Sequence, residues 1–75
     1  MNKARRKQIQ DAIIRIESLT SFVQGILDDE QEAFDNMPES LQESDNGMAS
    51  QEAQDNLESA IESLEEAIGC LEEIE

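Results

Sequence analysis

The carboxylates are the side chains of this sequence with the greatest capacity for chemistry, and they are unevenly distributed. Eighteen of the nineteen acidic residues lie between Ile16 and Glu75, a stretch without lysine, arginine or histidine, so its formal charge is −18. All basic residues lie in the first fifteen positions: Lys3, Arg5, Arg6, Lys7 and Arg15. Such a field repels nucleic acid and anionic membranes and attracts basic protein surfaces.

Clustered carboxylates suggest a cation site first. Asp45-Asn46-Gly47 is similar to the middle of a calcium-binding loop. Placing Gly47 at the sixth position of such a loop puts Gln42 first and Ala53 twelfth, where the loop needs carboxylates. A di-iron helical bundle needs Glu-x-x-His pairs, and the sequence contains no histidine. We therefore expect no metal site and no cofactor.

Acid–base or thiol catalysis is the second chemistry that these residues could support. Neighbouring carboxylates such as Glu65 and Glu66 would need a pocket that shifts a pKa, and a pair of helices offers none. Cys70 is the single cysteine; it has neither a disulfide partner nor a histidine to activate it. We expect a solvated charged surface, a passive thiol and no enzymatic activity.

Two long helical segments must position these acids. The first is predicted over about residues 3–35, and its apolar residues form a heptad seam. Ile13, Leu27 and Phe34 widen that seam, and Glu30 interrupts it. The seam consists of Ile9, Ala12, Ile16, Leu19, Val23, Ile26 and Ala33.

The second helix is predicted over about residues 50–75, with Ser50 as its N-cap. Its seam comprises Leu57, Ile61, Leu64, Ile68 and Leu71, and small residues beside it, such as Ala60 and Ala67, would let another helix approach closely. The connection is predicted over residues 36–49. Pro38 should end the first helix and start a short helical turn over residues 38–42, and we expect the connection's apolar residues to plug the end of the helix pair: Met37, Leu41 and Met48.

Together these elements predict a single all-α domain over residues 1–75, an antiparallel two-helix hairpin with a short helical turn in its connection. The basic residues of the first helix would then lie beside Glu72, Glu73 and Glu75. A lone hairpin of this size has little net stability. Ile14 and Phe22 lie outside the seam, and we expect them to form a dimer interface that builds a four-helix bundle; the alternative is that they are scattered surface residues.

One stretch resembles a known group of proteins. Residues 29–42, with the sequence DEQEAFDNMPESLQ, are followed by Ser44 and Gly47. This stretch resembles the small acidic helical-hairpin proteins encoded by phages, prophages and plasmids, and the resemblance covers about residues 17–68. It implies a mobile-element origin, an accessory role and no catalytic residues. The motif could be purely structural, with Asn36 capping the turn, or it could form a recognition surface.

The leading functional hypothesis is a non-enzymatic binding protein that engages a basic surface of a host protein, such as a defence or nucleic-acid-handling factor, in one version by mimicking the charge of DNA. The alternative is a structural accessory or oligomerisation hairpin. We expect a cytoplasmic protein in the host cell, a homodimer that binds neither nucleic acid nor membrane directly. The residues expected to contact the partner, here called the loop pole, are Asp28, Asp29, Glu32, Asp35, Asn36, Glu39, Gln42 and Glu43.

Overall fold

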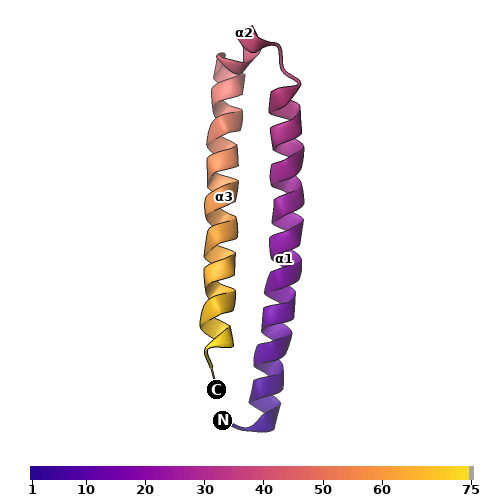
Figure 1. Cartoon of the computed structure of the whole chain (residues 1–75), viewed down its shortest axis with the longest axis vertical. Coiled ribbons are helices and arrows are strands. Elements are labelled where there is room, and N and C mark those ends of the chain that lie inside the picture. Colours follow the sequence, from indigo (N-terminus) through magenta and orange to yellow (C-terminus); the bar gives the residue numbers. More distant parts are fainter. Residues whose placement is uncertain (75) are drawn as a thin grey trace.

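The chain folds as two long antiparallel helices joined by a compact corner (Figure 1). The structure, a computed structural model, describes residues 1–74 and places helix α1 at Lys3–Asp35, α2 at Glu39–Gln42 and α3 at Asp45–Glu72. The molecule is a rod with extents of 58 × 15 × 12 Å, and both termini lie at one of its ends. The all-helical class and the hairpin predicted from the apolar periodicity are confirmed over these residues.

Helix α1 begins where the sequence predicts. The side chain of Asn2 accepts a hydrogen bond from the backbone N–H of Arg5 at 2.8 Å, which satisfies one of the free donors of the first turn. The helix ends at Asp35 because Pro38 disfavours helical backbone at Met37. Pro38 then precedes α2 as its N-cap, so the predicted helical turn after the proline is confirmed.

Helix α3 begins earlier than predicted, so the connection is shorter than expected and Ser44, not Ser50, caps the helix. Ser44 is the N-cap, and its hydroxyl accepts a hydrogen bond from the backbone N–H of Gly47 at 3.4 Å. The residues from Ser44 to Gly47 are therefore the first turn of α3 rather than a free turn, and Ser50 lies inside the helix. Asp45 in that first turn also interacts favourably with the positive end of the helix dipole.

The contact face of α1 is rotated from the predicted seam. Ile13 and Leu27 are the buried apolar residues of α1, and Ile61 is that of α3. Leu19 and Ile26 were expected in the seam but are 48% and 42% exposed, and Ala33 is also exposed. The inward face instead combines two heptad columns, one of which is the set predicted only to widen the seam: Ile9, Ile16 and Val23 with Ile13, Thr20, Leu27 and Phe34.

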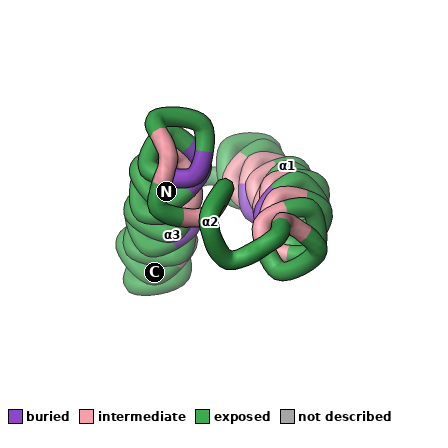
Figure 2. Tube along the Cα trace, turned by 90° about the horizontal axis from the view of Figure 1, so that it is seen from above, coloured by how far each residue is buried: buried purple, intermediate pink, exposed green. Residues whose placement is uncertain are grey.

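The burial pattern seen along the rod agrees with this rotation (Figure 2). Buried and half-buried residues line the sides of α1 and α3 that face each other, and the outer sides are exposed. Thr20 tolerates its inward position because its hydroxyl donates to the carbonyl of Ile16 at 2.8 Å. No large side chain among residues 1–74 is fully withdrawn from solvent, so the core of the isolated hairpin is a single thin layer.

The predicted apolar plugs of the connection are mostly wrong. Met37 is half-buried, but Leu41 and Met48 are 50% and 60% exposed. The early start of α3 explains the difference, because the corner closes through backbone contacts and leaves no space for these side chains between the helices. Glu75 was expected at the end of the second helix and lies outside the described residues.

Candidate functional site

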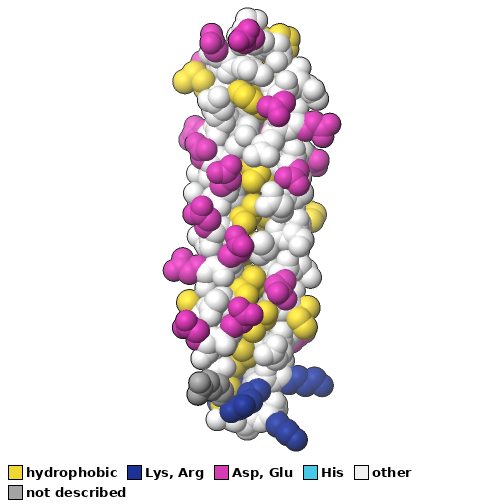
Figure 3. All heavy atoms as spheres, viewed as in Figure 1, with side chains coloured by type: hydrophobic (Ala, Val, Ile, Leu, Met, Phe, Trp, Pro, Cys, Tyr) yellow, Lys and Arg dark blue, Asp and Glu magenta, His cyan; other side chains and the backbone are white. Residues whose placement is uncertain are grey.

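The loop pole defined above lies at the end of the rod opposite the termini. Seven of its eight residues are exposed, and Gln42 alone is half-buried. Side-chain carboxylates cover this end and much of the length of the rod, whereas lysine and arginine side chains gather near the termini (Figure 3). The structure therefore brings the predicted acidic residues together on one corner of the molecule.

Gln42 differs from the other loop-pole residues because its side chain points inward. Its Nε2 donates hydrogen bonds to the carbonyl oxygens of Phe34 at 3.1 Å and Met37 at 3.2 Å. These carbonyls belong to the last turn of α1 and the residues just after it, where helical donors run out; the Phe34 carbonyl also accepts from the backbone N–H of Met37 at 3.0 Å. Gln42 thus closes the C-terminal end of α1, and this structural use competes with its predicted contact to a partner.

Gly47 sets how closely α2 and α3 approach at the corner. A Cβ atom at this position would lie 2.0 Å from the carbonyl oxygen of Gln42 and 2.6 Å from that of Leu41. Real Cβ atoms do not approach backbone atoms so closely, so only glycine fits. From the sequence, Gly47 was expected in the connection, and the signal that could have identified its role is its position three residues after Ser44, the N-cap of α3.

Just below the corner, Glu30 is held by a polar contact between the two helices. The hydroxyl of Ser50 donates to Glu30 Oε2 at 2.5 Å, and Gln54 Nε2 donates to the Ser50 hydroxyl at 3.3 Å. Ser50 is only 6% exposed. The predicted seam position of Glu30 is confirmed, and its partner is Ser50 with Gln54 behind it, a chain that fixes the register of α1 against α3.

Two exposed apolar side chains accompany the carboxylates at the corner. Leu41 on α2 and Met48 in the first turns of α3 are 50% and 60% exposed. They lie close in sequence to Glu39, Glu43 and Asp45. The loop end therefore offers apolar contact area next to negative charge, a combination not predicted from the sequence, in which both residues were expected inside the hairpin.

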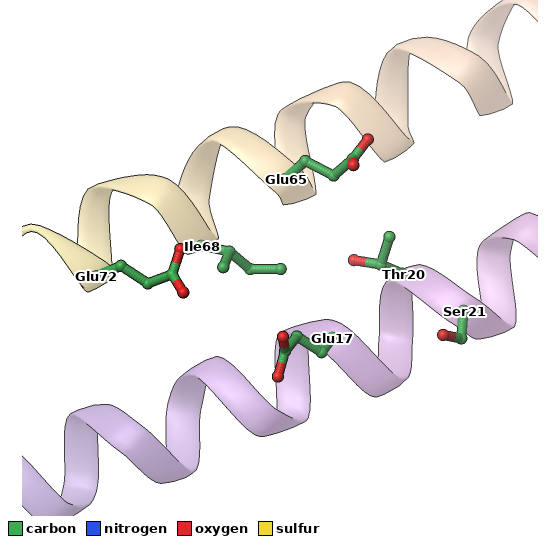
Figure 4. A pocket seen from close by; sticks show the side chains of 6 residues that line it. All are labelled: Glu17, Thr20, Ser21, Glu65, Ile68 and Glu72. Atoms are coloured by element: carbon green, nitrogen blue, oxygen red, sulfur yellow. The ribbon is translucent and has the colours of Figure 1, made fainter.

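A hollow lies between α1 and the C-terminal part of α3 (Figure 4). It has a volume of about 480 Å³, and three carboxylates, those of Glu17, Glu65 and Glu72, stand at its rim around Thr20 and Ile68. These rim acids are exposed, so the hollow is open to water and offers no desolvated position for a reacting group. Within residues 1–74 no three metal-ligating side chains are grouped so that they could hold an ion.

The open end of the rod differs from the sequence-based expectation. Within residues 1–74 the only ion pair joins Arg15 Nε to Asp11 Oδ2 at 2.9 Å, one helical turn apart on α1. The basic residues near the N-terminus reach no carboxylate of α3 within 4 Å in this part of the chain. These basic residues therefore form no ion pair with Glu72 or Glu73, and Ile9 and Ile74 line one small hollow at this end.

Both residues predicted to form a dimer interface are exposed, Ile14 at 58% and Phe22 at 68%. Cys70 is a free, exposed thiol. None of the helices described in residues 1–74 is long and apolar enough to span a bilayer. Comparisons with protein-family models, with curated proteins and with solved structures all return no match to this chain.

Proposed function

We propose that this chain is a non-enzymatic acidic binding protein of mobile-element origin that engages a basic surface of a host protein through its loop pole. One observation supports this most directly. A net charge of −14 is displayed on a narrow rod, and the only ion pair of residues 1–74 involves Asp11 rather than any loop-pole acid. The field of the loop pole is thus available to an approaching cationic surface.

The corner also supplies a means of holding a partner once charge has attracted it. Long-range electrostatics chiefly raises the rate of encounter, whereas buried apolar anchors supply much of the lasting affinity. Leu41 and Met48 are exposed beside the acids of the corner. We infer a partner whose basic patch encloses a small apolar depression.

Mimicry of DNA is a narrower version of this proposal, and charge density bears on it. One hairpin carries −14 over 58 Å, about one charge per 4 Å, against about one per 1.7 Å for duplex DNA. Two hairpins side by side would reach about one per 2 Å. A dimer therefore approaches the density of DNA and a monomer does not, so mimicry requires the dimeric four-helix bundle that the apolar pattern favours.

The same charge supports the remaining parts of the proposal. A basic partner is expected among host nucleic-acid-handling or defence proteins in the cytoplasm, because their surfaces are selected to bind polyanions. Direct binding to nucleic acid or to an anionic membrane is disfavoured by repulsion. The resemblance of residues 29–42 to phage and plasmid hairpins is the support for the mobile-element origin.

A structural accessory hairpin remains the second candidate, and the exposure of Ile14 and Phe22 favours it. Salt separates the two functions. Binding led by charge should weaken steeply as NaCl rises from about 50 to about 300 mM, whereas assembly through apolar surfaces should persist or strengthen.

The test is capture of host-lysate proteins on the immobilised chain at both salt concentrations. We expect the triple variant Asp28→Lys, Asp29→Lys and Asp35→Lys to lose the salt-sensitive proteins. The matched control reverses Glu58, Glu62 and Glu66, which changes the net charge equally but lies along α3. Loss of capture in both variants would indicate charge without a site, and retention in the loop-pole variant would exclude this site.

Adding duplex DNA as a competitor tests whether the chain mimics DNA. Release of the captured protein by about equimolar DNA would support mimicry, because the two polyanions would then share one surface. Simultaneous binding of DNA and the hairpin would exclude it. The double variant Leu41→Gln and Met48→Gln keeps the net charge, and we expect it to retain fast association but to dissociate faster.

A further inference from the structure

A third apolar column on each long helix is only partly covered within the hairpin, because Leu19, Ile26, Ala33 and Ala60 are exposed whereas Ala12, Ala53 and Ala67 are half-buried. On α1 the column repeats every seven residues, with Leu19 and Ile26 flanked by Ala12 and Ala33. On α3 it also repeats every seven residues: Ala53, Ala60, Ala67 and Ile74. Two columns suffice for a two-stranded seam, while a third is typical of helices that pack against more than one neighbour.

The two columns lie on the same face of the rod. Consider each helix viewed from its own N-terminus. At 3.6 residues per turn, the column on α1 and the column on α3 are both turned in the same direction away from the side of their helix that faces the other helix. Because α1 and α3 are antiparallel, an equal rotational sense along each chain direction places both columns on one side of the pair. We call this side the second face; Phe22 borders it, at 68% exposure.

Acidic residues avoid the second face. The acids of α3 lie either on its outer side or on the side of the hollow described above, beside Glu65 and Glu72. None falls within the arc that contains Ala53, Ala60 and Ala67. On α1, Glu30 belongs to the inward column and accepts a hydrogen bond from Ser50, and exposed Asp29 borders the second face in the same heptad column as Phe22. A charge-free apolar face on a chain of net charge −14 suits a partner with the same charge.

The amount of exposed surface matches what a second copy would cover. The hairpin exposes 5744 Å², whereas a compact monomer of 8.4 kDa exposes about 4,600 Å². The excess is about 1,100 Å², because the core is a single layer between two helices. A standard stable interface removes about 800 Å² from each partner, so one copy seated on the second face would account for most of the excess.

We propose that the second face is a homodimer interface, and that two hairpins pack through it as an antiparallel four-helix bundle. This refines the dimer considered above and holds whether or not a basic partner exists. In the antiparallel arrangement the basic end of one copy lies over the loop pole of the other, whereas the parallel arrangement would bring the two loop poles together. Charge therefore selects the antiparallel dimer.

The structure also revises which residues matter to the dimer. Phe22 borders the second face, but Ile14 lies more than a quarter-turn away from it around α1. Ile14 is 58% exposed and thus provides a matched control. It is the same kind of large, exposed side chain on the same helix, outside the proposed contact.

Sedimentation equilibrium of the full chain at about 10–300 μM tests the proposal. We expect a dimer of twice 8.4 kDa, with the double variant Leu19→Glu and Ile26→Glu weakening association at least 100-fold and Ile14→Glu changing it less than threefold. A wild-type mass of one chain across this range would overturn the proposal. Equal weakening by Ile14→Glu would overturn the assignment to this face.

Because a monomeric hairpin of this size has little net stability of its own, a second measurement avoids disruptive substitutions. Ala60 lies near the middle of the rod, where the antiparallel dimer brings α3 of one copy against α3 of the other. In the Cys70→Ser background, Ala60→Cys should form a disulfide-linked dimer under mild oxidation, and Glu58→Cys, on the acidic side of α3, should not. Cross-linking by both variants or by neither would reject the antiparallel contact.

Discussion

The two ends of the hairpin are held by different forces. At the loop end, Gln42 closes α1, Gly47 allows backbone contact between α2 and α3, and Ser50 binds Glu30 across the helices. At the open end, the ion pair of Arg15 with Asp11 lies within one helix, and Ile9 and Ile74 line a small shared hollow. Specific polar and steric contacts therefore set the register at the loop end, and the open end follows it.

Among these variants, replacing Gly47 should reduce the stability of the hairpin most. Gly47→Ala places a Cβ against the backbone of Gln42 and Leu41, which no side-chain rotation can relieve, and we expect a loss of about 3 kcal/mol. Urea denaturation followed by circular dichroism measures it. As controls, Gly25→Ala and Gly69→Ala meet no atom within 4 Å and should each stabilise by up to about 1 kcal/mol; destabilisation by all three would contradict the corner model.

Removing the hydrogen bond between Ser50 and Glu30 should cause the next largest loss of stability. Ser50→Ala removes the donor to a carboxylate that faces the other helix, and hydrogen bonds to charged groups contribute about 1.5–3 kcal/mol. We expect a loss of about 2 kcal/mol, partly recovered in the double variant that adds Glu30→Leu, since the unbonded carboxylate is then gone. A double-mutant cycle with no coupling between the two positions would show that the contact does not set the register.

Gln42 should contribute somewhat less. Gln42→Ala leaves the carbonyls of Phe34 and Met37 without this donor, although water can reach part of the site because Gln42 is only half-buried. We expect a loss of about 1 kcal/mol and faster amide hydrogen exchange confined to the last turn of α1 and the corner. Uniformly faster exchange along both helices would indicate instead that the corner and the open end unfold together.

Substitutions at the open end should change the stability least. Arg15→Gln removes the described ion pair, but Arg15 and Asp11 are 80% and 57% exposed in their side chains, so we expect a change of about 0.5 kcal/mol or less. Melting temperatures of this variant and the parent at low and high salt provide the measurement. A loss comparable to that of Ser50→Ala would mean that charge, rather than the corner, holds the helices in register.

Much of the hairpin could be predicted from the sequence because it depends on local rules. Pro38 ends α1 and precedes α2 wherever the chain is placed, and the heptad repeats require two helices. The start of α3 was missed because Ser44-Asp45-Asn46-Gly47 satisfies both a turn and a helix N-cap. Only the contact between Gly47 and the backbone of Gln42, which joins neighbouring elements in space, decides between them.

The candidate site was predicted in part for the same reason. Exposure of the acids follows from their charge, since unpaired carboxylates are rarely buried. The inward use of Gln42 and the exposure of Leu41 and Met48 depend on how the corner closes, and residue type alone does not reveal it. The order of acids along the chain predicted a charged pole but not the apolar residues beside it.

The sequence by itself determined two amphipathic helices, the break between them and a surface dominated by negative charge, because propensity, periodicity and ionisation are properties of neighbouring residues. The tertiary structure decided which two of three apolar columns face inward. Ile13 and Leu27 are buried while Leu19 and Ile26 are exposed, and Glu30, in the same heptad column as Ile16 and Val23, accepts a hydrogen bond from Ser50 on α3. Three columns cannot all fit one interface between two helices, and the column left over is the face that we propose for dimerisation.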